Sequence, residues 1–391
     1  MTDIMILSGA RTAIGTFGGA LAATAPIDLG AAVSKAAMER AGVAPDQIGH
    51  VAFGHVINTE PRDMYLSRAA AMQAGVPDTV PAMNVNRLCG SGVQAIVSVI
   101  QSLSLGDAEF GLAGGAENMS RSPYILPQAR WGQKMGDAGA QDMMLGALNC
   151  PFGTGHMGVT AENVAAEHGI TREMQDAFAM ESQERAAKAI AEGRFADQIT
   201  PIEVRVKRDM VAFDTDEHPK ATSLEALAGL RAVFQKDGSV TAGNASGIND
   251  GAGAVVLASE AAARASGLTP RARVLGYAHA GVRPEVMGIG PVPAVQKLLE
   301  RTGLKASDFD VIESNEAFAA QALAVSQELG FDPAQVNPNG GAIALGHPVG
   351  ATGAIITVKA LYELERIRGS KALITMCIGG GQGIALAIER V

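Results

Sequence analysis

The sequence has little cysteine and little positive charge. Only three of its 391 residues are cysteine, with no C-x-x-C pair and no Cys/His ligand spacing, which argues against a disulfide framework and a zinc site and favours a reducing compartment. Lys and Arg number 31 against 40 Asp and Glu, a formal net charge of -9. This balance argues against nucleic acid and anionic membranes as partners, although a local basic patch could still bind a phosphorylated ligand. We expect no metal site.

Targeting and membrane signals are also missing. The chain begins Met1-Thr2-Asp3 without a basic n-region, and its end, Glu389-Arg390-Val391, is not a peroxisomal address. No charge-free apolar run is judged long enough to cross a membrane. The expected location is therefore cytoplasmic, without membrane contact.

Aromatic residues are scarce, at 4%, whereas glycine is abundant, with 47 residues. A content of 47% hydrophobic residues with so many glycines is typical of a globular α/β protein with tight turns between strands and helices. Short apolar strands alternate with helical patterns over residues 4–118. This alternation predicts a mainly parallel sheet with helices on its faces.

The order of elements in the first part recurs from residue 271 onward. In this repeated order, a glycine-flanked turn at His347 corresponds to the turn at Cys89. A turn at Cys377 corresponds to the turn at Gly114. Two similar halves would bring strand-end turns from both to one site, as in other open sheets. Residues between the halves differ in composition and include one long helix candidate over 160–192, interrupted near Gly169; we interpret them as an insertion that covers the site. The expected parts are an N-terminal half of residues 1–118 plus 248–270, a loop domain of 119–247 and a C-terminal half of 271–391.

The stretch NRLCGSG at residues 86–92 is the strongest candidate for chemistry. Cys89 lies between an extended apolar segment and a helix start, where free N–H groups and the helix dipole favour a thiolate. A small buried cysteine beside packing glycines would show the same local pattern. A cysteine nucleophile also needs a base and donors for an oxyanion. His347, Cys377 and Asn315 lie at the matching strand ends, which favours the catalytic interpretation.

Four motifs, in this order, resemble those of the thiolase family. They are NRLCGSG at 86–92 (its acyl-accepting cysteine block), NEAF at 315–318, GGAIALGHP at 340–348 (its histidine block) and CIGGG at 377–381 (its second-cysteine block). The likeness extends from about residue 4 to residue 389. Within the family, RDMY at 62–65 and ARWG at 129–132 are most similar to bacterial β-ketothiolases of broad chain-length range.

The resemblance implies a fold and a reaction. The fold is α/β, with duplicated βαβαβ halves forming a five-layered αβαβα core, an inserted loop domain, and assembly into a homotetramer (a dimer of dimers) or a dimer. The reaction is reversible acyl transfer through a Cys89 acyl-enzyme, either thiolysis of 3-ketoacyl-CoA by CoA or Claisen condensation of two acetyl-CoA molecules. His347 would be the base and Cys377 the second acid/base. One oxyanion would be held by the N–H groups of Cys89 and Gly379, the other by His347 and a water on Asn315.

Coenzyme A is implied as a substrate, with no tightly bound cofactor. A pantetheine arm needs an apolar channel with a few polar contacts, and its phosphates need cations. Lys220 is the candidate cation, while Cys150 is interpreted as a packing residue. The residues that match the CoA channel of thiolases are Leu148, His156, Met157, Phe234, Ala242, Ser246, Met287 and Phe318.

Other functions stay open. A β-ketoacyl synthase shares the fold but usually has a second His at the position of Cys377. A non-catalytic acyl-CoA or lipid-binding relative should have lost a catalytic residue, and none is missing. The segment GTGHMG at 153–158 matches G-x-G-x-x-G, but no strand precedes it, which argues against NAD binding.

Overall fold

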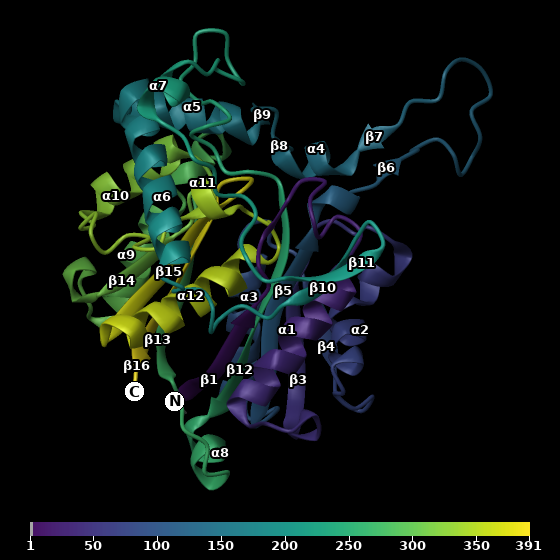
Figure 1. The fold of residues 1–391 in the computed structure, drawn as a ribbon, viewed down its shortest axis with the longest axis vertical. Coiled ribbons are helices and arrows are strands. Elements are labelled where there is room, and N and C mark those ends of the chain that lie inside the picture. Colours follow the sequence, from purple (N-terminus) through teal and green to yellow (C-terminus); the bar gives the residue numbers. More distant parts are fainter. Residues whose placement is uncertain (1–2) are drawn as a thin grey trace.

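The two halves of the chain lie side by side, with the inserted segment across one end (Figure 1). This arrangement comes from a computed structural model, which describes residues 3–391. The main sheet has ten strands in the order β14-β15-β16-β13-β1-β12-β5-β3-β4, and β2 pairs with β12 off this path. The halves share this sheet only through β1 and β13, where Met5 faces Arg273 and Ile6 faces Ala272.

The sheet of the N-terminal half has one strand that runs against the others. Its strands are β1 (Ile4–Arg11), β3 (Ile48–Gly54), β4 (Ala82–Val85), β5 (Phe110–Asn118) and β12 (Asn249–Ser259). β3 runs parallel to β4 and β5, but β12 runs antiparallel to both β1 and β5. β1, β3, β4 and β5 thus run in one direction, as predicted from residues 4–118, whereas β12 runs back along its neighbours because the insertion leaves at the carboxyl end of β5 and returns there.

The C-terminal half repeats this plan. Its strands are β13 (Ala272–Gly281), β14 (Val311–Ser314), β15 (Lys371–Ile378) and β16 (Gln382–Arg390). β14 runs parallel to β15, and β16 runs antiparallel to β15 and β13. β15 therefore takes the place of β5 and β14 that of β3, as the recurring sequence pattern predicted.

Two central helices join the halves. They are α3 (Ser91–Leu105) and α12 (Thr352–Ile367), whose apolar residues share one buried cluster with strands of both halves. The helices cross at glycines: a Cβ on Gly92 would lie 2.6 Å from the backbone nitrogen of Ala354, and one on Gly353 would overlap that of Val93. The outer faces are covered by α1 (Pro26–Ala41) and α9 (Pro291–Thr302). The layers thus follow the expected order helix, sheet, helices, sheet, helix.

The first central helix contains most of an apolar run that is long enough to cross a membrane, contrary to our expectation from the sequence. Leu88–Leu105 has a mean hydropathy of 1.5 and is long and apolar enough to cross a membrane by these measures alone. In the structure most of this segment is packed between the halves, with Val93, Ile96 and Val97 fully buried. The run therefore belongs to a core helix.

The insertion contains the long helix candidate predicted over residues 160–192, which forms two helices divided at the predicted interruption. Gly169 ends α5 (Met157–His168) in the left-handed conformation, at φ 65°, and α6 (Arg172–Ala191) follows. The remaining elements of the chain are short. They are β2 (Gly15–Thr16), η1 (Pro45–Gln47), η2 (Pro61–Tyr65), α2 (Leu66–Gln73), η3 (Met119–Arg121), β6 (Tyr124–Ile125), β7 (Gln141–Asp142), α4 (Met143–Leu148), β8 (Asn149–Cys150), β9 (Gly155–His156), β10 (Ile202–Val206), β11 (Asp209–Phe213), α7 (Leu224–Ala228), α8 (Glu260–Ala265), η4 (Pro284–Ile289), η5 (Ala306–Asp308), α10 (Ala319–Leu329) and α11 (Ala342–Leu345).

Candidate active site

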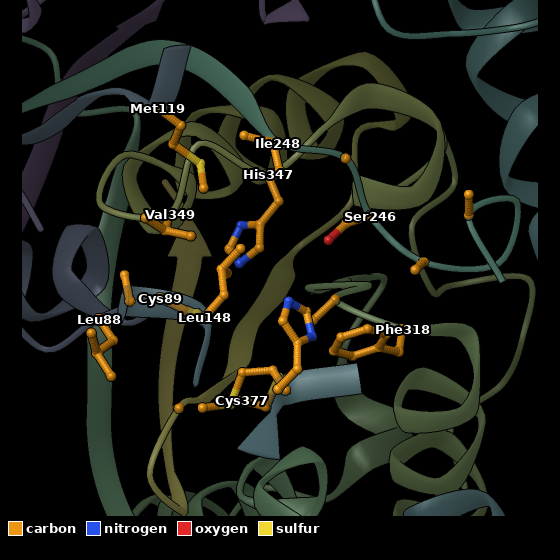
Figure 2. Close-up of a pocket in the computed structure, with 18 of the residues that line it drawn as sticks. Leu88, Cys89, Met119, Leu148, Ser246, Ile248, Phe318, His347, Val349 and Cys377 are labelled. Atoms are coloured by element: carbon orange, nitrogen blue, oxygen red, sulfur yellow. The ribbon is translucent and has the colours of Figure 1, made fainter. Parts of the chain in front are cut away.

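A cavity of about 390 Å³ lies where the strand ends of both halves meet the insertion. Cys89, His347, Cys377 and Gly379 all line it. Figure 2 shows His347 pointing into the cavity from above, Cys89 projecting from one side and Cys377 lying below. The duplicated architecture therefore brings together the turns that the sequence pattern paired.

The Cys89 turn is held in an uncommon backbone conformation. Leu88 has a φ of 45°, in the left-handed region that residues other than glycine rarely adopt. Ser91 stabilises the turn, since its hydroxyl accepts from the N–H of Arg87 at 2.8 Å and donates to the carbonyl of Leu88 at 2.6 Å. A Cβ on Gly90 would lie 2.5 Å from the end of the Ile378 side chain, so any larger residue there would have to displace Ile378. The turn thus presents Cys89 to the cavity at the start of α3.

The protonation state of Cys89 differs from our expectation. Burial raises the pKa of its thiol to about 11, although the N–H groups of Gly379 and Cys89 oppose this shift. The N–H groups thus favour the thiolate, as predicted, but loss of solvation outweighs them in the resting site. Cys89 is a neutral thiol, and a reaction at its sulfur would need a base.

The hydrogen bonds around His347 define which nitrogen can act as that base. Its Nδ1 lies 2.7 Å from the hydroxyl of Thr352, which donates its own proton to the carbonyl of Pro348 at 2.9 Å. Nδ1 must therefore carry the proton, and the lone pair lies on Nε2. Burial lowers the pKa of His347 to about 4, so the ring is neutral. The carboxamide of Asn249 accepts from the backbone N–H of His347 at 2.9 Å and fixes the start of this turn.

Cys377 is a second, more deeply buried thiol. It ends β15 with no exposed surface and packs with Met157 and Phe318. Burial, with a smaller effect of Cys89, raises the pKa of Cys377, so this thiol is also neutral. Cys150 lies in the same apolar cluster and does not line the cavity, in agreement with a packing role.

Asn315 lies behind His347 and does not line the main cavity. Its Nδ2 is 3.5 Å from Nε2 of His347, and its Oδ1 has no hydrogen-bond partner within residues 3–391. Asn315 instead lines a small separate cavity of about 10 Å³ with Thr352 and Lys359, close to the room that one water needs. The side chain is thus close to the base but not open to a large ligand.

All predicted CoA-channel residues line the main cavity. Its wall is mainly apolar and aromatic: His156 stacks on Phe234 with ring centroids 4.6 Å apart, and Phe234 meets Phe318 edge-on at 6.2 Å. Lys220 is the only Lys or Arg among the lining residues that the structure describes. The others of the predicted set are Leu148, Met157, Ala242, Ser246 and Met287.

Some lining residues were not predicted. His218 is one of them; its Nδ1 has no partner in the described part of the chain, and burial with Lys220 lowers its pKa to about 4. Its only signal in the sequence is its closeness to Lys220. Near Cys89, the wall also includes Leu88, Met119 and Val349, all apolar (Figure 2).

Two family models cover nearly the whole chain. One described as "Thiolase, N-terminal domain" matches residues 4–261, and one described as "Thiolase, C-terminal domain" matches residues 268–390. The chain belongs to the thiolase family. It is 59% identical over 391 residues to beta-ketothiolase BktB from Cupriavidus necator, a match that covers 100% of this chain and 99% of that thiolase.

Solved thiolase structures share the fold. The acetyl-CoA acetyltransferase of Bacillus anthracis aligns with a TM-score of 0.98 and 47% identity, over 100% of this chain and 99% of that one. Human mitochondrial 3-ketoacyl-CoA thiolase in complex with CoA aligns with a TM-score of 0.97 and 43% identity, over 100% and 98% of the two chains. The expected thiolase fold is confirmed.

Two further expectations concern other ligands. The segment at residues 153–158 forms β9 and the start of α5, and β9 pairs antiparallel with β8. This is not the strand-turn-helix unit that a dinucleotide fingerprint requires. Among residues 3–391, no group of three His, Cys, Asp or Glu side chains is arranged to hold a metal ion.

Proposed function

We propose that this cavity carries out reversible thiolysis through an acyl group on Cys89. The chain is an acyltransferase of the thiolase family that acts on CoA thioesters. The proposed route is supported by one observation above all: Cys89, His347 and Cys377 line a single cavity, in which the N–H groups of Cys89 and Gly379 lower the pKa of the Cys89 thiol. A nucleophile, a base, a second acid and oxyanion donors are the groups that the reaction needs.

In the first half-reaction, the Cys89 thiol gives its proton to Nε2 of His347, and the sulfur attacks the 3-keto carbon of a 3-ketoacyl-CoA. The C2–C3 bond then breaks, so that the acyl group stays on sulfur and the electron pair goes to C2 of acetyl-CoA. Cys377 protonates C2 and afterwards regains a proton from His347. The N–H groups of Cys89 and Gly379 hold one oxyanion; His347 and a water on Asn315 hold the other.

In the second half-reaction, His347 takes the proton of a CoA thiol, and the thiolate attacks the acyl group on Cys89. Cys89 leaves as a thiolate and takes the proton back from His347. In the reverse direction, acetyl-CoA acetylates Cys89, and Cys377 removes the α-proton of a second acetyl-CoA. The two thiols therefore have separate duties, acyl transfer and proton transfer.

CoA is the shared substrate in this scheme, and no tightly bound cofactor is proposed. The aromatic and aliphatic wall around Phe234 would pack against the pantetheine arm, since such arms prefer apolar channels. Lys220 would bind a CoA phosphate, with His218 beside it as a neutral polar contact. The human relative whose structure contains CoA supports CoA as the ligand.

We propose that each of the three parts expected from the sequence contributes a different component of the site. Residues 1–118 with 248–270 would form the half that carries Cys89, and residues 271–391 the half that carries His347 and Cys377. Residues 119–247 would form the loop domain that binds CoA. This division is supported by β12, which closes the first sheet after the insertion. We place the reaction in the cytoplasm.

A thiolysis series with 3-ketoacyl-CoAs of increasing length tests the function. We expect CoA-dependent loss of the magnesium-acetoacetyl-CoA absorbance. We also expect kcat/KM for 3-ketohexanoyl-CoA to lie within about tenfold of that for acetoacetyl-CoA, because flexible Met119 and the apolar wall near Cys89 can accept added methylenes. No turnover with any chain length would favour the binding relative over the enzyme. Turnover of acetoacetyl-CoA alone would contradict the broad range.

We also propose a homotetramer, a dimer of dimers. The segment between β6 and β7 forms an arm that projects beyond the body of the molecule (Figure 1). It exposes apolar side chains: Trp131 is 84% exposed, Met135 91% and Leu126 54%. Exposed apolar residues on an arm favour a contact with another copy. Strand β4, at the free edge of the sheet beside exposed Met64 and Tyr65, would support a second contact.

The double substitution Trp131→Ser and Met135→Ser is expected to convert the tetramer into a dimer, because it removes the largest apolar side chains of the arm. Light scattering coupled to size-exclusion chromatography measures the mass. Leu105→Ser is the matched control, since Leu105 is 81% exposed at the end of α3, away from the arm. A variant that keeps the mass of the unmodified protein, or an unmodified protein that is monomeric, would contradict the proposed assembly.

A further inference from the structure

A fully buried carboxylate connects the two halves next to the cavity. Glu117 lies near the end of β5 and has no exposed surface. Its Oε2 accepts from the N–H of Val56 at 3.0 Å and of Gly350 at 2.9 Å, and its Oε1 accepts from the N–H of Ile57 at 3.1 Å. One side chain thus holds the loop after β3 and the turn after His347 at the same time.

The turn after His347 fits closely around this carboxylate. A Cβ on Gly350 would overlap Oε2 of Glu117 and would lie 3.1 Å from Cα of His55, so a side chain cannot be added there. The carbonyl oxygen of Gly350 lies against Gly54 and Gly115. A Cβ added to Gly115 would overlap this oxygen, and one added to Gly54 would lie only 2.5 Å from it. The turn is therefore enclosed by backbone on one side and bound to Glu117 on the other.

The carboxylate has a defined polar surrounding. The Nδ1 of His55 donates to the carbonyl of Ala116 at 2.9 Å and lies 3.5 Å from Oε1 of Glu117, and Nε2 of His55 lies 3.9 Å from Asp63. Burial raises the pKa of Glu117, and His55 with the three N–H groups opposes this shift. Loss of the hydrogen bonds to Glu117 would leave buried N–H groups without an acceptor, which would lower the stability of the folded protein.

The elements that Glu117 holds also form the cavity wall. Val56, Met119 and Val349 line the cavity, and each is within two residues of Glu117 or of a group that it binds. His347 is three residues before Gly350 and carries the lone pair that receives the Cys89 proton in the proposed mechanism. A shift of this turn's backbone would therefore move the proposed base, His347, relative to the proposed nucleophile, Cys89. A misplacement of about 1 Å can lower the rate roughly 10²-fold.

We infer that Glu117 is a positioning residue for the thiolase reaction: by binding the N–H groups of Val56 and Gly350 together, it fixes His347 opposite Cys89. This inference rests on the proposed role of His347 as the base. Glu117 itself touches neither substrate nor the reacting atoms.

Glu117→Gln tests the inference, because the amide keeps the shape but places an N–H donor against one of the backbone N–H groups. We expect kcat for thiolysis to fall by about 10- to 100-fold, while KM for CoA stays within about twofold because the channel wall around Phe234 is untouched. In a His347→Ala background, the same substitution should cost less than about threefold, because the base that it positions is already gone. Glu117→Asp, with its shorter reach, should lose less than Glu117→Gln.

Asp63→Asn is the matched control. Asp63 is also fully buried and accepts backbone N–H groups, those of Thr59 and Glu60, but it makes no hydrogen bond to the turn after His347 within the described chain. Its kcat should stay within about twofold of the unmodified protein. Three results would each overturn the positioning role. The first is an unchanged kcat in Glu117→Gln, and the second is an equal fold-loss from Glu117→Gln in the His347→Ala background and in the unmodified protein. The third is a loss of kcat in Asp63→Asn equal to that in Glu117→Gln. An inactive unmodified protein would overturn the proposed function instead.

Discussion

Cys89→Ala is expected to lower kcat for thiolysis by at least about 10⁴-fold, because removal of a covalent nucleophile disables every later step of acyl transfer. The resting thiol of Cys89 has a raised pKa, so its attack depends on transfer of its proton to His347. In the proposed mechanism Cys89 alone carries the acyl group, and the N–H groups of Gly379 and Cys89 lower the pKa of its thiol. Thiolysis rates and the intact mass after incubation with acetyl-CoA measure the effect.

The mass measurement should show one added acetyl group on the unmodified protein and none on Cys89→Ala. Cys150→Ala is the control, since Cys150 is buried and does not line the cavity. It should keep both the acetyl group and a kcat within about twofold, as expected for a substitution distant from the reacting groups. Substantial thiolysis by Cys89→Ala, or an acetyl group on that variant, would show that another residue carries the acyl group.

Cys377→Ala is expected to separate acetylation from carbon–carbon bond formation. The variant should still accept an acetyl group on Cys89, because that step uses His347 and the N–H donors. Condensation of two acetyl-CoA molecules should fall by about 10²- to 10⁴-fold, the usual effect of losing a general acid or base. Mass spectrometry follows the acetyl group, and a coupled assay follows the formation of acetoacetyl-CoA.

Cys377→Ser provides the matched comparison, since it keeps a hydroxyl in the same buried place. A hydroxyl is a far weaker acid than a thiol, so the serine variant should also be acetylated and also be slow in condensation. The alanine and serine variants together distinguish proton transfer from packing in the cluster with Met157 and Phe318. Equal loss of acetylation and condensation in both variants would contradict a separate role for Cys377.

Cys89, His347 and Cys377 could be predicted because each lies within a short motif. Cys89 follows strand β4 and Cys377 lies near the end of β15, but His347 follows the short helix α11 rather than a strand. Thr352, which sets the tautomer of His347, lies only five residues from it on the same turn. That contact could have been expected from a hydroxyl at the start of a helix after the histidine.

The residues that hold the site from behind could not be predicted. Glu117 is 233 residues from Gly350 in the chain, and Asn249 is 98 residues from His347. No local pattern connects such pairs, because their contact depends on how the two halves of the chain pack. The raised pKa of Cys89 could not be predicted for the same reason: a helix start is visible in the sequence, but the loss of solvent depends on what covers the thiol.

The crossing of α3 and α12 has a consequence for how activity depends on the whole chain. The two helices touch through Gly92 and Gly353, with backbone against backbone. Each helix begins just after one of the reacting turns, so the distance from nucleophile to base is set where the halves meet. Neither half alone contains both groups, so under the proposed mechanism a chain whose halves have begun to separate would not form the acyl-enzyme. Under the same mechanism, the thiolysis rate would report the fraction of molecules in which the two halves are packed together.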